Sequence, residues 1–318
     1  MLNRILVPLD GSSLAECVLP HVIVIAQAFD AQVTLLRVLE RPNDSELMHA
    51  IDPIEWQLIK AKAEAYLKDV TIRLEKSGLN VQRILKEGQA AKSIIDFAHR
   101  NDINLIVLSS HGQSGLSGWN VSSIVQKIVL LAYTSLLIVR AYQPAHKDLA
   151  SIGYQKIMVP LDGSQRAENV LPLTMLLSRF YGSQLLLTHM VHKPDMLSRT
   201  PLSSVEIKLL NKITERNRKE AKQYLEEIRS RSMEGVNIRL YINEGNSSDL
   251  HNVVELEGVN LVVLGAHGYS GNPKWPYGSV ALNFIVYGTT SLLIVQDISH
   301  DEARKTGAEF IGREEKGH

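Results

Sequence analysis

The feature that most limits the possible folds is an internal repeat: the same short sequence motifs occur twice, in the same order, along most of the chain. VPLDGS occurs at 7–12 and again at 159–164, and TSLLIV occurs at 134–139 and again at 290–295. The motifs keep their order at a separation of about 150 residues, whereas solenoid repeats have periods of about 20–50 residues. The repeat therefore predicts two homologous domains in tandem, which we call half one and half two.

Both halves show the same alternation of strand-like and helix-like patterns. In half one, the apolar run from Arg4 to Val7 is followed by apolar residues at helical spacing from Leu14 to Ala26. Runs such as LIVLSS and LVVLGA are apolar without interruption, which is typical of strands buried on both faces. The alternation predicts a parallel sheet with helices on both faces in each half. Strands of half two are expected near 155–160, 184–190, 236–242, 260–265 and 291–296.

Composition argues against several classes of partner. The chain has 34 Lys and Arg and 34 Asp and Glu residues, so its charge gives no reason to expect nucleic acid or an anionic membrane. Cys17 is the only cysteine, which rules out an internal disulfide and a cysteine-based zinc site.

The N-terminal residues lack the apolar region of a signal peptide, and no apolar run reaches the roughly 20 residues that span a bilayer. We therefore expect a cytoplasmic protein.

The residues that follow the strands of half two indicate where a ligand would bind, because ligands of open α/β sheets bind at the carboxyl edge of the strands. Asp162 and Met190 follow the first two strands. Gly265 to Gly268 follow the fourth strand, and Gly278-Ser279 precede the last helix. A helix start with small residues suits phosphate, and a glycine lets a ligand approach the backbone. The alternative is that these residues only make turns and cap a helix.

The spacing of these glycines resembles that of the universal stress protein family in its tandem two-domain form. The nucleotide-binding branch of that family has the motif G-x2-G-x9-G-[ST], which Gly265, Gly268, Gly278 and Ser279 match in full. VPLDGS in both halves and the closing SLLIV are also typical of the family. The resemblance implies two tandem Rossmann-like (adenine nucleotide alpha hydrolase-like) domains. Each would be an α/β domain with a five-stranded parallel sheet of order 3-2-1-4-5 and helices on both faces.

The resemblance also implies a domain division, a ligand and the residues that hold the ligand. The domains are expected at 1–143 and 153–297, followed by a charged tail at 298–318. The ligand would be ATP, with Mg²⁺ or Mn²⁺ on its phosphates, bound mainly in half two. The glycines and Ser279 would hold phosphate and ribose, Asp162 would lie beside the nucleotide, and Met190 would face adenine through its backbone. The full set implied for half two is Asp162, Met190, Gly265, His267, Gly268, Gly278, Ser279 and Val280.

Half one departs from the motif. Ser109 stands at the first glycine, and Ser122-Ser123 stand at the Gly-Ser pair. A hydroxymethyl group at each glycine position would narrow the space for phosphate, although Ser122 or Ser123 could still cap the helix. Binding there is expected to be weaker. The residues implied for it are Asp10, Val38, Gly112, Ser122 and Ser123.

No motif of a dedicated enzyme accompanies the glycines. The chain lacks a G-x4-G-K-[ST] phosphate loop and a G-x-S-x-G elbow, and no nearby acid or cysteine completes a metal set with His189 and His192. His267 and Asp162 are the best placed for chemistry, but we interpret His267 as packing against its loop. We predict no catalytic residue and no protein metal site. Three functions stay open: a nucleotide-binding stress-response regulator, an interaction scaffold without nucleotide, and a slow ATP hydrolase.

The resemblance also implies how the halves pack, because the family often pairs its domains through the last strand. SLLIVR and SLLIVQ would then meet as edge strands, so that the two domains form a pseudo-dimer within one chain. Two chains could associate further as a homodimer. Trp56 is expected to be buried, because exposing a large apolar side chain is costly.

Overall fold

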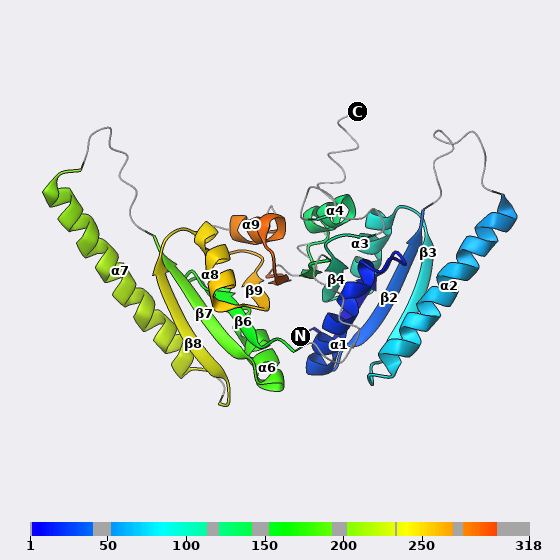
Figure 1. Ribbon diagram of the computed structural model, residues 1–318, viewed down its shortest axis with the longest axis horizontal. Helices are drawn as coiled ribbons and strands as arrows, with labels where there is room; N and C mark the ends of the chain where they lie inside the picture. Colours follow the sequence, from blue (N-terminus) through cyan, green and yellow to red (C-terminus); the bar gives the residue numbers. More distant parts are fainter. Residues whose placement is uncertain are drawn as a thin grey trace.

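The computed structural model describes residues 2–40, 52–112, 121–141, 153–192, 202–232, 234–269 and 276–297. The expected tail at 298–318 and most of the segment between the two expected domains lie outside these residues. The described residues form one ten-stranded sheet with helices on both faces (Figure 1).

Each half contributes five strands to the sheet. In half one these are β1 (Arg4–Pro8), β2 (Gln32–Leu39), β3 (Val81–Glu87), β4 (Leu105–Ser109) and β5 (Ser135–Val139). In half two they are β6 (Lys156–Pro160), β7 (Gln184–Val191), β8 (Asn237–Glu244), β9 (Leu261–Gly265) and β10 (Ser291–Val295). The uninterrupted apolar runs became strands that are buried on both faces, as in β5, where every residue is buried.

The strand order is the same in both halves. The sheet reads β3-β2-β1-β4-β5-β10-β9-β6-β7-β8, so each half has the order 3-2-1-4-5 when its own strands are numbered. All pairs within a half are parallel. The predicted fold class and strand order are confirmed. The order reverses between β1 and β4 and between β6 and β9, where such a sheet leaves a crevice at its carboxyl edge.

Helices cover the sheet in two layers. One layer holds α1 (Leu19–Phe29), α2 (Pro53–Glu75), α6 (Leu171–Tyr181) and α7 (Ser204–Ser230), and the other holds α3 (Ala90–Arg100), α4 (Ser123–Leu131), α8 (Leu250–Glu257) and α9 (Ser279–Tyr287) (Figure 1). Short helical turns are η1 (Ala15–Val18), α5 (Gln165–Glu168) and η2 (Ser247–Asp249). Each layer encloses its own apolar core, and each core contains residues of both halves.

Local sequence signals explain where the two longest helices begin. The side chain of Asp52 accepts a hydrogen bond from the backbone of Ile54 at the start of α2. Ser203 and Glu206 form a reciprocal capping box at the start of α7. Such caps satisfy N–H groups that have no partner within the helix.

The halves are joined through their last strands. β5 and β10 pair antiparallel, with Leu137 opposite Leu293, which confirms the predicted meeting of SLLIVR and SLLIVQ. The hydroxyl of Tyr277 in half two donates to the carbonyl of Thr134 in half one at 2.7 Å. Because both cores continue across this junction, the two halves share one hydrophobic interior.

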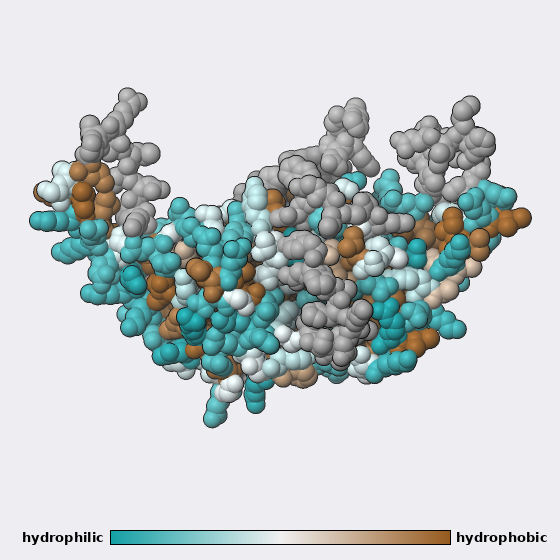
Figure 2. Space-filling view, in the orientation of Figure 1, coloured by the Kyte–Doolittle hydropathy of each residue, from teal (hydrophilic) through white to brown (hydrophobic). Residues whose placement is uncertain are grey.

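Some large apolar side chains of the long helices are buried, and others are exposed to solvent. Trp56 is only 7% exposed and packs with Leu39 and Ala63, which confirms its predicted burial. Figure 2 shows apolar side chains at both outer ends of the molecule, where Ile54 on α2 and Val205 on α7 are largely exposed. Within the described ranges, no helix is both long enough and apolar enough to cross a membrane.

Candidate functional site

A cavity of about 640 Å³ lies at the carboxyl edge of half two, where the strand order reverses. Its walls come from the ends of β6, β7 and β9 and from the start of α9. The structure brings all eight residues predicted for half two to these walls, although Asp162 and Val280 stand far apart in the sequence. The described parts of the loop between β9 and α9 therefore border a cavity rather than only connecting two elements.

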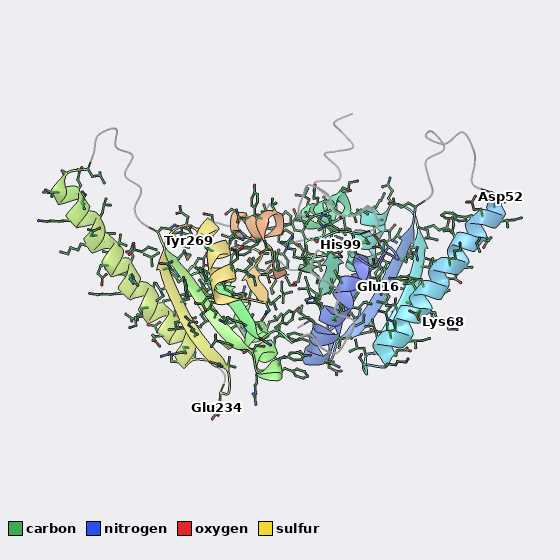
Figure 3. The ribbon with its side chains drawn as sticks, in the orientation of Figure 1. Glu16, Asp52, Lys68, His99, Glu234 and Tyr269 are labelled. Carbon is green, nitrogen blue, oxygen red and sulfur yellow. The ribbon has the colours of Figure 1, made fainter. Side chains whose placement is uncertain are left out.

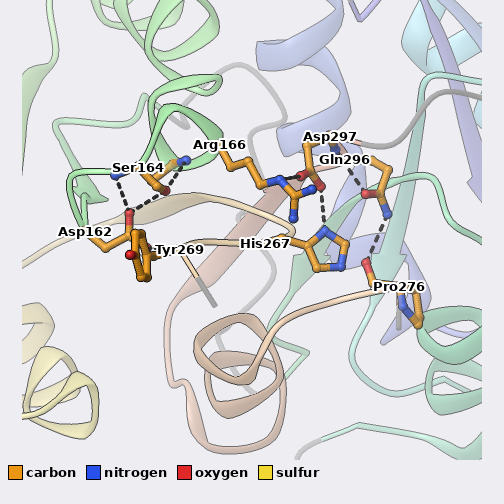
Figure 4. Close-up of polar contacts among 9 residues, drawn as sticks. Asp162, Ser164, Arg166, His267, Tyr269, Pro276, Gln296 and Asp297 are labelled. Atoms are coloured by element: carbon orange, nitrogen blue, oxygen red, sulfur yellow. Dashed lines mark hydrogen bonds and ion pairs between the residues drawn. The ribbon is translucent and has the colours of Figure 1, made fainter. Parts of the chain in front are cut away.

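Asp162 ties the loop after β6 to the loop after β9 (Figure 4). Its Oδ1 accepts hydrogen bonds from the backbone N–H of Ser164 at 2.9 Å and from the Ser164 hydroxyl at 2.6 Å. Its Oδ2 accepts one from the backbone N–H of Tyr269 at 2.7 Å. Burial alone would raise the pKa of Asp162, but the hydrogen bonds from Ser164 and Tyr269 favour the charged form and lower it. Asp162 is therefore a carboxylate at the cavity wall.

Gly268 lacks a side chain for a reason that sequence reasoning missed. A Cβ atom at Gly268 would overlap Oδ2 of Asp162. Half one repeats the arrangement, since a Cβ at Gly112 would overlap Oδ2 of Asp10. The protein's own carboxylate, and not only an approaching ligand, therefore favours glycine at this position of the motif, because a larger residue would displace the carboxylate.

The first glycine of the motif is also bounded by the protein's own backbone. A Cβ at Gly265 would lie 3.1 Å from the carbonyl oxygen of Arg166 and 3.2 Å from that of His267. In half one the hydroxyl of Ser109 turns the same way and donates to the carbonyl of Leu14 at 3.0 Å. The expectation that Ser109 narrows the space for phosphate is therefore wrong, because its hydroxymethyl group lies against backbone.

The starts of α9 and α4 differ in their side-chain caps, and this difference changes how many backbone N–H groups are available to an anion. The backbones match: Gly278 N–H donates to Ala266 at 2.7 Å, and Ser122 N–H donates to Ser110 at 2.8 Å. The Ser122 hydroxyl caps α4 by accepting from the N–H of Val125 at 3.4 Å, whereas Gly278 offers α9 no side-chain cap. The first N–H groups of α9 thus keep their hydrogen-bonding capacity and the partial positive charge of a helix start.

His267 is buried and held by a partner that sequence reasoning did not identify. Its Nδ1 donates to Oδ1 of Asp297 at 2.6 Å, and Oδ2 of Asp297 lies 3.6 Å from Nε of Arg166 (Figure 4). Asp297 stands two residues after the end of β10, and only its position after the last strand could have drawn attention to it. Half one has Ala141 at this place, and there His111 Nδ1 lies 3.1 Å from the hydroxyl of Ser110. The Asp297 contact orients His267, consistent with a packed side chain.

The two histidines for which the sequence offers no metal set, His189 and His192, also line the cavity. His189 belongs to β7, and burial lowers its pKa, so it is neutral near pH 7. His192 lies just beyond β7, with Nδ1 3.3 Å from Oδ1 of Asn246. Among the described residues, no group of three or more His, Cys, Asp or Glu side chains is arranged to hold a metal ion.

Half one repeats the framework of the site. Oδ1 of Asp10 accepts from the backbone N–H of Ser12 at 2.9 Å and from its hydroxyl at 2.7 Å, as Asp162 does from Ser164. Val38 is half-buried near the end of β2, and Ser122-Ser123 stand at the start of α4. The residue before Val38 is Arg37, where half two has His189 before Met190.

The fold and this edge define a tandem Rossmann-like α/β protein with a preformed crevice in its second half. The model of the universal stress protein family matches residues 1–140 and 153–296, and the chain belongs to this family. Both halves are thus members of one family, as their repeat predicts.

Individual relatives agree with this assignment. A universal stress protein of Methanocaldococcus jannaschii is 29% identical over 144 residues, which cover 43% of this chain and 82% of that protein. The structure of a universal stress protein from Archaeoglobus fulgidus covers 93% of this chain and 99% of its own at a TM-score of 0.63 and 16% identity, which shows the fold alone. A universal stress protein solved in complex with cAMP covers 44% of this chain at a TM-score of 0.35 and 18% identity, too low a similarity to transfer its ligand.

Proposed function

We propose that this protein is a stress-response regulator that binds ATP mainly in half two. The observation that carries the proposal is the start of α9 at Gly278, which has no side-chain cap and borders the cavity. ATP occupancy would shift the protein between states or partners. We assign the domains to residues 1–143 and 153–297, with the charged tail at 298–318.

The phosphates would lie at the start of α9. Backbone N–H groups of Ser279 and Val280 belong to its first turn, and both residues line the cavity together with Gly278. Such groups bind anions because they lack partners within the helix and carry the positive end of its dipole. Gly265, His267 and Gly268 also line the cavity and would complete the phosphate site.

The nucleoside would lie toward the ends of β6 and β7. Met190 and Leu250 supply apolar surface for adenine, and the Met190 backbone supplies polar groups for its edge. Asp162 is ionised, so it would accept hydrogen bonds from ribose hydroxyls and repel the phosphates. This opposition of charge would orient ATP with its phosphates toward α9.

A divalent cation would bind mainly to the phosphates. Mg²⁺ keeps several waters and commonly takes phosphate oxygens together with one or two carboxylates. Asp162 is the acidic side chain among the described residues that line the cavity. A metal site made of protein ligands alone would need several such groups, so Mg²⁺ or Mn²⁺ would be carried in by the phosphates of ATP.

Half one would bind nucleotide more weakly. The self-capping hydroxyl of Ser122 occupies an N–H group that a phosphate would otherwise use. Asp10, Val38, Gly112 and Ser123 keep positions equivalent to those of half two, so the difference would lie in the helix cap and in Arg37.

Calorimetric titration of the full chain with Mg-ATP tests the proposal. We expect one tight site, weakened about tenfold by Gly278→Ser, which copies the self-cap of half one. A Cβ at Gly278 would lie 3.4 Å from its nearest neighbour, an ordinary contact, so this variant should fold. The matched variant Ser122→Gly should leave the tight site unchanged. Wild-type protein that binds no ATP, and carries none after purification, would reduce the function to a ligand-free scaffold.

The same mixtures of protein and Mg-ATP can be used to measure ATP hydrolysis and the oligomeric state. ADP appearing during incubation would reveal the slow ATP hydrolase. A cytoplasmic location and a homodimer of chains are further parts of the proposal that rest on the family resemblance. Light scattering with and without Mg-ATP measures the homodimer.

A further inference from the structure

Arg37 of half one and His189 of half two hold the same place in the duplicated sheet. Arg37 follows Leu36, which pairs with Pro8 of β1, and His189 follows Thr188, which pairs with Pro160 of β6. At this position of the carboxyl edge, half one therefore has the cationic side chain of Arg37, and half two has the neutral imidazole of His189.

Neighbours on two sides hold the Arg37 guanidinium. A Cβ at Gly11 would lie 2.9 Å from its Nη1 and 3.0 Å from its Cζ, so the group rests against the loop after β1. Its Cζ lies 5.2 Å from the centre of the Tyr66 ring, within the range of a cation–π contact. In half two, a Cβ at Gly163 would meet nothing within 4 Å. Arg37 thus occupies a space that half two leaves open.

Within the described residues, the Arg37 guanidinium forms no ion pair and donates no hydrogen bond, although the carboxylates of Glu16 and Asp10 lie near the same Tyr66 ring. The neighbouring carboxylates have other partners. Glu16, labelled in Figure 3, lies 2.8 Å from Nη1 of Arg73. Oδ1 of Asp10 accepts two hydrogen bonds from Ser12. A half-buried guanidinium whose planar donors are unused is suited to a bidentate oxyanion.

We propose that half one holds an anion site on Arg37 that takes a phosphate group, either as inorganic phosphate or at the end of a phosphomonoester. This site goes beyond the ATP site of half two and uses neither its glycine motif nor α9. The contacts of Arg37 with the Tyr66 ring and with Gly11 restrict the movement of its guanidinium. Little side-chain entropy of Arg37 is therefore lost when the anion binds. The two halves would then bind different phosphate ligands from one duplicated framework.

Titration of the full chain with inorganic phosphate, at saturating Mg-ATP, tests this site. We expect saturable binding by the wild type and a loss of about tenfold or more in Arg37→Gln, since charge-assisted hydrogen bonds are lost. Arg37→His, which copies half two, should show the same loss and serves as the second variant. Arg83→Gln removes an equal charge from an exposed position on the next strand and should bind phosphate as the wild type does.

Two results would overturn the proposal: no saturable phosphate binding by the wild type, or equal binding by Arg37→Gln and the wild type. Gly278→Ser separates this site from the ATP site, because it should weaken ATP and leave phosphate binding intact. Repeating the titration with a phosphomonoester such as ribose 5-phosphate distinguishes the two sources. Tighter binding than inorganic phosphate identifies the ester, and equal binding identifies the free anion.

Discussion

Arg140 offers a sharp test of how the two halves depend on each other. It directly follows β5 in half one and is fully buried, and its guanidinium donates three hydrogen bonds to half two. Nη2 donates to the carbonyl of Phe284 at 2.7 Å, Nη1 to that of Ile285 at 3.2 Å, and Nε to that of Thr290 at 3.4 Å. A cation from one half thus binds the carboxyl end of α9, where the helix dipole is negative.

We expect Arg140→Ala to destabilise the whole protein by about 3–5 kcal/mol, because each buried carbonyl left without its donor costs about 1–3 kcal/mol. The carbonyl of Ile285 would lose its hydrogen bond, and a cavity would remain where the side chain lay. With a urea dependence of about 3 kcal/mol per M, the unfolding midpoint should fall by about 1–1.7 M. The shared core predicts that both halves unfold in one transition.

Gln296 is the matched control, because it stands after β10 where Arg140 stands after β5. Its side chain donates from Nε2 to the carbonyl of Pro276 at 3.1 Å and accepts at Oε1 from the backbone N–H of Asp297 at 3.0 Å. Both are ordinary hydrogen bonds between neutral groups, so Gln296→Ala should cost only about 1–2 kcal/mol. Equal midpoints for the two variants, or an Arg140→Ala midpoint unchanged from the wild type, would refute the reasoning.

Three further predictions concern the site. Gly268→Ala should cost about 1–3 kcal/mol and weaken ATP binding, because the new Cβ overlaps Asp162; thermal unfolding and titration measure both. The lowered pKa of Asp162 should stabilise the fold fully above the unfolded value of about 4 and be lost as pH falls through the folded pKa. Asp162→Asn should accordingly flatten the Tm-against-pH curve between about pH 5 and 2, and identical slopes would contradict this. Asp297→Ala should cost about 1–3 kcal/mol by leaving buried His267 without its acceptor, whereas an unchanged Tm would show that the pair contributes nothing.

Local patterns determined the architecture of this protein. The repeat of VPLDGS and TSLLIV, the apolar runs and the helical spacing predicted two α/β domains with parallel sheets, and the strand pairing confirms them. The order 3-2-1-4-5 and the junction of β5 and β10 were implied by the family resemblance, and the structure shows both. Such features follow from the sequence because hydrophobic periodicity and turn chemistry act over a few residues.

Only the tertiary structure decided what each side chain contacts. Ser109 turns toward backbone, Gly268 makes room for Asp162, and Asp297 holds His267. Arg140 reaches from one half into the other, and Arg37 rests between a glycine and a tyrosine. These contacts join residues far apart in the sequence, so the direction of each side chain depends on the packing of elements that no local pattern specifies.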